Sequence, residues 1–432
     1  MRTPGTTGLD SDADEPSPSE KRIIEVRDHL RAALADYDLA QRRRLIDFLL
    51  DHCCVVLVAT TGIDRAHRMF TVLNATGKPL ARNDVLKAAL LGSTPTARAL
   101  WTEAETRLGD DFEALFSHIH AMYGRPGARV ISDVMEIADA SGGAQAFIER
   151  VVRPAAVVLD DLRRAHHEGS SQSAAITRYL RYFGWHSSAD WIPPAMLFWL
   201  ERGDDAAELA WFLGALDRLA FAIRILGVGG TKRTRRFGAV VTAIRDGREL
   251  RGSDSPLALT RQEQRTIQHN LRELHARNPP AAKHVLLRVG DAMAGEPQSA
   301  SVFADITVEH VLPRKLAARS QWRGWFPDHE EREQCTESLG NLVLVTKAQN
   351  DKAGNLDFAR KHEVYFNTPG APVLLINEDL RGRGDWTPEQ IRKREAKLLR
   401  QVEALWSFNM VGVPESFADP SLDATVRERR RA

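Results

Sequence analysis

A succession of amphipathic segments, from about residue 95 to residue 290, most strongly limits the fold of this chain. Examples are "ALWTEAETRLGDDFEALFSHIHAMYG" and "DAAELAWFLGALDRLAFAIRILG". Their apolar residues recur with the period of an α-helix that buries one face. The pattern therefore predicts a mainly α-helical chain, with a helical domain over residues 96–295.

The segments on either side of this domain differ in composition. Residues 1–20 and 413–432 are rich in small, polar and charged residues without periodicity, which is typical of disordered tails. A helical pattern over 20–52 covers the start of the segment 21–95. The segment continues through the β-branched run "CCVVLVATT", which predicts a short strand, to a helix–turn–helix pattern in "IDRAHRMFTVLNATGKPLARNDVLKAALLG".

Composition excludes several classes of protein. The net charge of +1 does not by itself indicate a nucleic-acid partner, although local basic clusters remain compatible with one. The cysteines Cys53, Cys54 and Cys335 form no CxxC pair, which argues against a disulfide framework and a cysteine-based zinc site. No apolar run of membrane-spanning length and no signal-peptide core occurs, so we expect a cytoplasmic protein without a membrane partner.

Residues 296–412 break the helical pattern. Two β-branched runs, "DITVEHVL" and "LGNLVLVT", predict strands, and a helix is expected after the second. A long helix closes the segment in "WTPEQIRKREAKLLRQVEALW", with Thr387 as its N-cap and Pro388 at its first position. We therefore expect an α+β domain wrapped by C-terminal helices.

Polar residues in this domain stand where strands and helix meet. His310 leaves the first strand, Asn341 opens the second, and Asn350 stands near the helix start. A hairpin followed by a packed helix would gather these side chains with Glu309 in one pocket. That set suits metal-assisted phosphodiester cleavage, with Mg²⁺ or Mn²⁺ held by Glu309 and Asn350. A neutral His310 would take a proton from water, while Asn341 would fix its tautomer.

Each of these residues also has a purely structural interpretation. His310 is compatible with a buried structural histidine, Asn341 with a turn cap, Asn350 with a helix N-cap and Glu309 with a solvent-facing side chain. A zinc site built from His310, His329 and Cys335 matches no usual ligand spacing.

A basic cluster occurs in the helical domain. The stretch "GGTKRTRRFG" holds Lys232, Arg233, Arg235 and Arg236 after two glycines. It is compatible with a solvated loop, with contacts to a DNA phosphate backbone, or with an inward-facing patch that pairs with acids.

The motifs "TVEHVLP", "LGNLVLVTKAQN", "LDFARKHEVYF" and "WTPEQIRKREAKLLRQVEALW" resemble the C-terminal HNH nuclease domain of GmrSD-type restriction endonucleases, whose architecture SspE-like effectors share. The resemblance implies a ββα-metal core acting on DNA in phage defence. His310 matches the general base, Glu309 and Asn350 match metal-site positions, and Asn341 matches the central asparagine. Lys352 and Lys361 match basic positions near the phosphate.

A second motif resembles the end of the same family's N-terminal domain. It is "FTVLNATGKPLARNDVLKAALLG", in which the matching positions are Asn74, Gly77, Leu80, Asp84 and Lys87. The "DGQQR" signature of the ParB-like, nucleotide-handling head does not occur. We therefore interpret residues 21–95 as a remnant of that domain, and expect a separate nucleotide-binding or modification-sensing subunit as one way to supply the head.

The sequence thus predicts a divalent-metal-dependent HNH endonuclease or nickase that acts on double-stranded DNA. Two alternatives stay open at this point. One is a non-catalytic DNA-sensing or scaffold subunit of a defence system, and the other is a nuclease toxin that no regulatory head restrains.

Overall fold

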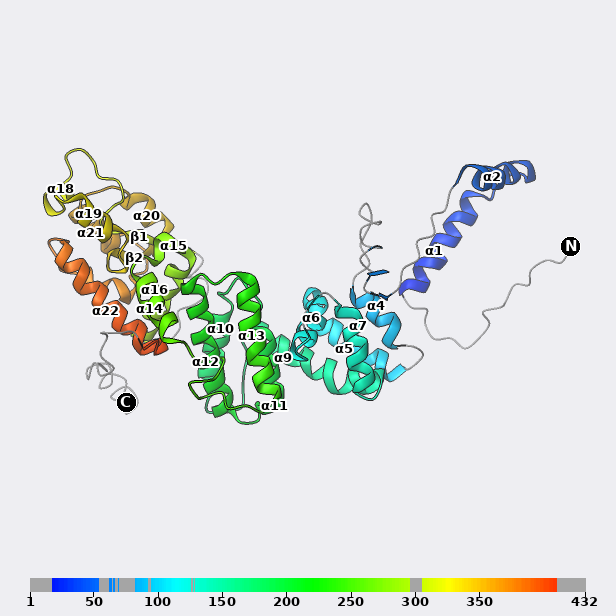
Figure 1. Cartoon of the computed structure of the whole chain (residues 1–432). Helices are drawn as coiled ribbons and strands as arrows, with labels where there is room; N and C mark the ends of the chain where they lie inside the picture. The colour runs from blue at the N-terminus through cyan, green and yellow to red at the C-terminus, as the bar shows by residue number, and fades with distance from the viewer. Residues whose placement is uncertain are drawn as a thin grey trace. The chain divides into compact units, whose positions relative to one another are not determined.

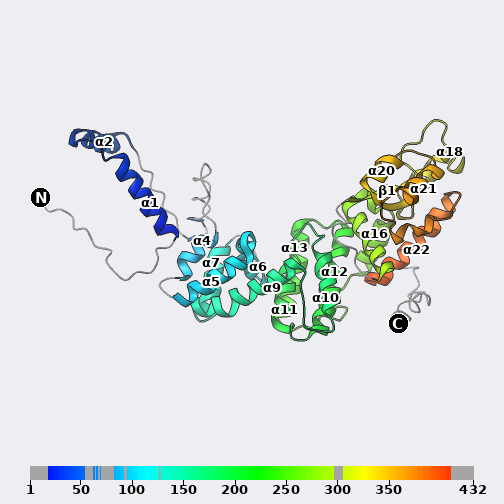
Figure 2. The same cartoon turned by 180° about the vertical axis from the view of Figure 1, so that it is seen from behind.

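The computed structural model describes residues 18–53, 62–63, 65–66, 69, 82–91, 95–125, 127, 129–295 and 305–409. The chain divides into two units, Met1–Thr61 and Gly62–Ala432. Figures 1 and 2 show the elements of both units from opposite sides.

The first unit contains the helices α1 (Pro18–Ala33) and α2 (Leu39–His52). Asp38 caps α2, because its carboxylate accepts from the Gln41 backbone N–H while the Gln41 side chain accepts from the Asp38 N–H. These helices confirm the pattern over 20–52. The β-branched run after Cys53, and Asn74, Gly77 and Leu80 of the second motif, lie outside the described residues.

The second unit is mainly helical, which confirms the predicted class. Its first part holds ten α-helices within the described ranges, with one π-helical turn at Ile148–Val152. Phe198 and Phe212 stack inside it with ring centroids 3.9 Å apart. The helices are α4 (Arg82–Leu91), α5 (Pro95–Leu108), α6 (Phe112–Met122), α7 (Val130–Ala140), α8 (Ala144–Phe147), α9 (Arg153–Arg164), α10 (Ser173–Phe183), α11 (Ile192–Arg202), α12 (Ala206–Leu226) and α13 (Gly230–Arg245).

Local sequence sets the limits of α12, the longest of these helices. Asp205 caps its start by accepting from the backbone N–H groups of Ala207 and Glu208. Gly227 ends it with φ of +67°, a left-handed conformation that glycine adopts without steric cost.

The basic stretch "GGTKRTRRFG" is helical, since α13 begins at Gly230. The interpretation of this stretch as a loop was therefore wrong. Its glycines precede and open a helix, and the basic residues occupy the first turns.

The remaining elements surround a small sheet. Strand β1 (Ile306–His310) pairs antiparallel with β2 (Leu342–Thr346), and His310 lies opposite Leu342. Both predicted strands are thus confirmed, as is the capping of the last helix by Thr387. The helices around the sheet are α14 (Arg261–Arg272), α15 (Leu274–Arg277), α16 (Pro279–Ala294), α18 (Trp322–Trp325), α19 (His329–Glu337), α20 (Lys347–Ala353), α21 (Phe358–Asn367) and α22 (Pro388–Trp406).

The sheet is covered on both faces. Leu342 and Leu344 belong to the main core, which continues into the helical part of the unit and includes residues of α16 and α22. Val343 and Val345 face a second core that includes Phe358 and residues of α20 and α21. Because neighbouring residues of a strand point to opposite faces, this double burial explains the unbroken apolar sequence of β2.

Close packing fixes the start of β2. A Cβ at Gly340 would lie 2.2 Å from the Ile391 carbonyl oxygen of α22, so only glycine fits there. The buried Arg394 guanidinium donates to the carbonyls of Gly340 and Leu342. These contacts join α22 to the edge of the sheet at which His310 lies.

Candidate functional site

Glu309 and His310 are neighbours in β1, and their side chains have separate surroundings. Because successive side chains of a strand point to opposite faces, Glu309 points toward α21 and His310 points toward α15. The two groups do not share the single pocket that the sequence predicted. The period of two along a strand is the physical reason.

The Glu309 carboxylate belongs to a buried ion pair. Lys361 donates from Nζ to Glu309 Oε1 over 2.6 Å and to the His310 carbonyl over 2.7 Å, and the Tyr365 hydroxyl donates to the same Oε1 over 3.2 Å. Lys361 is fully buried, and burial lowers its pKa while the nearby carboxylate opposes that shift. The predicted DNA contact of Lys361 is therefore wrong, because its ammonium group is enclosed.

The imidazole of His310 lies against a second set of polar groups. The rings of His275, from α15, and His310 meet edge to face, with centroids 4.8 Å apart. His310 Nε2 lies 3.8 Å from Glu337 Oε2 at the end of α19. Arg314 donates to both Glu337 oxygens over 2.9 and 3.1 Å, and its Nη2 lies 3.2 Å from His275 Nδ1.

His310 keeps an unused nitrogen. Its Nε2 is buried and has no hydrogen-bond partner. Burial, aided by His275, Arg314 and Lys361, lowers the pKa of His310 to about 3. Burial also lowers the pKa of His275, and the positive charge of Arg314 adds a smaller shift in the same direction. A neutral imidazole carries one lone pair that accepts a proton or binds a metal ion.

Asn341 holds the backbone on both sides of His310. Its Oδ1 accepts from the Leu312 N–H over 2.7 Å and from Trp386 Nε1 over 3.2 Å. Its Nδ2 donates to the carbonyls of Leu312 and Thr336, each over 3.0 Å. The fully buried side chain thus ties the segment after β1 to the segment before β2, and it positions His310 through the backbone rather than through the ring.

Asn350 lies inside α20 and not at its N-cap, which is Thr346. Its Nδ2 donates to Thr307 Oγ1 and to the Val308 carbonyl, each over 3.0 Å. Neither bond joins it to Glu309. Lys352, further along the same helix, is exposed and remains accessible to a ligand.

The four basic residues of α13 divide into two pairs. Arg233 donates to Asp190 over 2.5 Å, and Arg236 donates to the Pro256 carbonyl over 2.6 Å and lies 3.5 Å from Glu263. The inward-facing alternative is thus confirmed for these two arginines. Lys232 and Arg235 are exposed.

One group of metal-ligand residues occurs within the described ranges. The ligand atoms of His275, His310 and Glu337 all lie within 4.8 Å of one another. His329 is exposed on α19, and Cys335 packs in the second core, where burial raises its thiol pKa to about 11. The group around His310 therefore differs from the triplet of His310, His329 and Cys335, whose spacing matches no usual zinc site.

Sequence reasoning missed His275, Arg314 and Glu337. Arg314 directly follows the motif "EHVLP", and this position next to His310 is a sequence signal that could have identified it. His275 and Glu337 stand in charged helical stretches without any local signal, and only the packing of α15 and α19 around β1 brings them to His310.

The described helices include none that is long and apolar enough to cross a membrane.

No curated protein matches the chain. Residues 261–401, about a third of the chain, match the family described as GmrSD restriction endonucleases, C-terminal domain. This segment contains His275, His310, Arg314 and Glu337, which together form the His310 site. A restriction endonuclease domain implies DNA as the substrate and a role in defence. Residues 261–401 are thus similar to the C-terminal domain of GmrSD restriction endonucleases, a match that supports a GmrSD-type family member.

Proposed function

We propose that this chain is a divalent-metal-dependent DNA endonuclease or nickase of the HNH type that restricts modified or foreign DNA. The observation that carries the proposal is His310, with its unpaired ring nitrogen at the end of β1 inside the family segment. The order β1, β2, α20, with α20 packed on both strands, supports a ββα nuclease core.

In the proposed reaction His310 takes a proton from the water that attacks phosphorus. Its Nε2 has no hydrogen-bond partner, so a neutral imidazole can present a lone pair to this water there. Asn341 keeps the backbone around it in place. The Arg314 side chain is 52% exposed, so its guanidinium is able to turn from Glu337 to a DNA phosphate, which it would bind through paired hydrogen bonds.

The donor atoms beside His310 fit a divalent ion. His275 and Glu337 would hold it, with His310 adjacent, once the exposed Arg314 turns away, because Arg314 donates to both Glu337 oxygens and lies against His275 Nδ1. Oε1 of the predicted ligand Glu309 is bound by Tyr365 and by the fully buried Lys361, which has no such freedom to turn. When bound, the ion would stabilise negative charge on the phosphate. An imidazole ligand favours Mn²⁺ over Mg²⁺, which prefers oxygen ligands.

The proposal is tested by plasmid nicking with Mn²⁺ or Mg²⁺, with and without EDTA. We expect cleavage that requires the ion and is faster with Mn²⁺. DNA that is bound but never cut would support the scaffold alternative instead. Cleavage that continues in excess EDTA would exclude a metal-dependent mechanism.

The ligand assignment predicts how cleavage responds to metal concentration. Replacing His275 by Ala or Glu337 by Gln should raise the Mn²⁺ concentration for half-maximal cleavage about tenfold or more, in line with the loss of a ligand or its support. Glu333→Gln is the matched control, because Glu333 lies on the same helix and is exposed. Identical metal titrations for all three variants would remove these residues from the ion site.

Among the basic residues of α13, we expect the exposed Lys232 and Arg235 to bind DNA, and not the paired Arg233 and Arg236. Replacing Lys232 and Arg235 by Gln should lower DNA affinity and reduce the slope of log K against log salt by about 2, since each lost phosphate contact changes it by about 0.9. The control pair Arg163 and Arg164 is also basic, but each already contacts an aspartate. Binding measured by fluorescence anisotropy over a salt series would reveal an unchanged slope if α13 does not contact DNA.

A further inference from the structure

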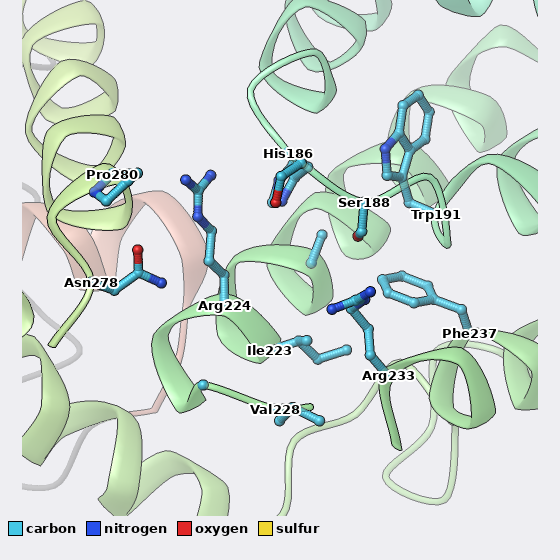
Figure 3. Close-up of a pocket in the computed structure, with 13 residues that line it drawn as sticks. His186, Ser188, Trp191, Ile223, Arg224, Val228, Arg233, Phe237, Asn278 and Pro280 are labelled. Carbon is cyan, nitrogen blue, oxygen red and sulfur yellow. The ribbon is translucent and has the colours of Figure 1, made fainter. Parts of the chain in front are cut away.

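A cavity of about 390 Å³ lies in the helical part of the second unit (Figure 3). Its walls come from α12, α13, the segment that leads into α11, and the start of α16. This volume is within the range of pockets that bind small molecules, about 300–1,000 Å³. Its polar lining includes His186, Ser188, Arg224, Arg233 and Asn278.

Arg224 supplies a positive charge that no described carboxylate neutralises. Its Nη1 donates to the Trp185 carbonyl over 2.9 Å and lies 2.6 Å from His284 Nδ1, both of which are uncharged partners. Burial lowers the pKa of both groups, His284 to about 3, so that the imidazole is neutral at pH 7. A half-buried guanidinium without an anion is costly to keep unless a ligand supplies one.

The neighbours of Arg224 add further hydrogen-bonding groups. His186 Nε2 is buried and has no partner, and burial with the nearby Arg224 lowers the pKa of His186 to about 3. Figure 3 shows the Arg224 guanidinium between His186 and Pro280, with Arg233 near Ser188 and Phe237. Arg233 is held by Asp190, which leaves this second guanidinium ordered beside the cavity.

The start of α16 favours an anion at the same place. Asn278 caps this helix of 16 residues, and both Asn278 and Pro280 line the cavity. The N-terminus of a helix carries partial positive charge from its aligned peptide dipoles. Pro279 and Pro280 have no N–H and the Ala281 N–H donates to Asn278 Oδ1, so α16 adds this charge to the cavity and not hydrogen bonds from its first N–H groups. Two guanidinium groups, a hydroxyl and an unpaired imidazole nitrogen are thus gathered with a helix N-terminus around one volume.

We propose that this cavity binds the phosphate group of a small ligand. Arg224 would form the charged hydrogen bonds to it, with Ser188, His186 and Arg233 around it. Inorganic phosphate and a nucleotide share this chemistry, and the experiment separates them. The chain has no Walker-type loop, so binding is proposed here and hydrolysis is not.

The experiment is isothermal titration of the whole chain with inorganic phosphate, and separately with ATP and GTP, without DNA or metal. We expect saturable binding of one ligand per chain, tighter for a nucleotide if the cavity also holds its base or ribose. Arg224→Met should weaken binding about tenfold or more, because a hydrogen bond to a charged group is lost. Arg150→Met, at an exposed arginine outside the cavity, should bind as the parent does.

Ser188→Asp provides a second test that leaves Arg224 and its packing in place. Its added carboxylate should repel a phosphate and weaken binding, while Ser188→Ala should change it little. Absence of binding to the parent chain, or equal affinity in the parent, Arg224→Met and Ser188→Asp proteins, would overturn the proposal. Because neither DNA nor metal is present, a failure of the nuclease proposal leaves this result unaffected.

Discussion

Replacing His310 by Ala should slow DNA cleavage by about 10² to 10⁴-fold, the usual contribution of a general base. The reason is that Nε2 of His310 is the buried ring nitrogen beside Glu337 that has no other partner. Single-turnover nicking of plasmid DNA at saturating Mn²⁺ measures the effect on the chemical step. His329→Ala is the matched control, since His329 is exposed on α19 and should leave the rate unchanged.

The His310→Ala protein should remain folded. No hydrogen bond of Nε2 is lost in the variant, so the main cost is a small cavity beneath α15. Thermal unfolding of parent and variant, followed by circular dichroism, checks this before rates are compared. An undiminished rate in a folded His310→Ala protein would mean that another group activates the water.

The sequence allowed the elements around this site to be predicted because their signals are local. The β-branched runs before His310 and after Asn341 became β1 and β2, and Thr387 with Pro388 began the last helix. Each of these depends on residues within a few positions of one another. Side-chain direction along β1 was equally local, yet the predicted pocket placed Glu309 and His310 together against the alternation of a strand.

The partners of His310 could not be predicted in the same way. His275 comes from a four-residue helix before β1, and Glu337 ends a helix after it. The residues next to His275 and Glu337 in the sequence give no sign of a functional role. The site forms only when α15 and α19 pack at the end of the sheet where His310 lies. The pairing of Arg233 with Asp190 and of Arg236 with loop carbonyls likewise depends on tertiary packing.

Breaking the ion pair between Glu309 and Lys361 should have the largest effect on stability. Replacing Lys361 by Met leaves a buried carboxylate without its cation, and replacing Glu309 by Gln leaves a buried ammonium group without its anion. Removing one partner of a buried pair costs about 3–5 kcal/mol in the free energy of unfolding. Urea unfolding at pH 7 measures the change for each variant. Arg360→Met is the matched control, because Arg360 is exposed and pairs with Glu363, so its loss should alter neither stability nor cleavage appreciably.

The double variant Glu309→Gln with Lys361→Met separates a structural pair from a catalytic one. With both charges removed, the protein should regain most of the lost stability, since an uncharged pair leaves no unpaired buried ion. If the pair only holds the fold, the double variant should also regain cleavage, because the side chains of His310, His275 and Glu337 are kept and only the bond from Lys361 to the His310 carbonyl is lost with the pair. A stable double variant that cannot cut DNA, together with a Glu309→Gln protein that keeps Lys361 and also fails to cut, would restore Glu309 to the metal site that the family resemblance implies.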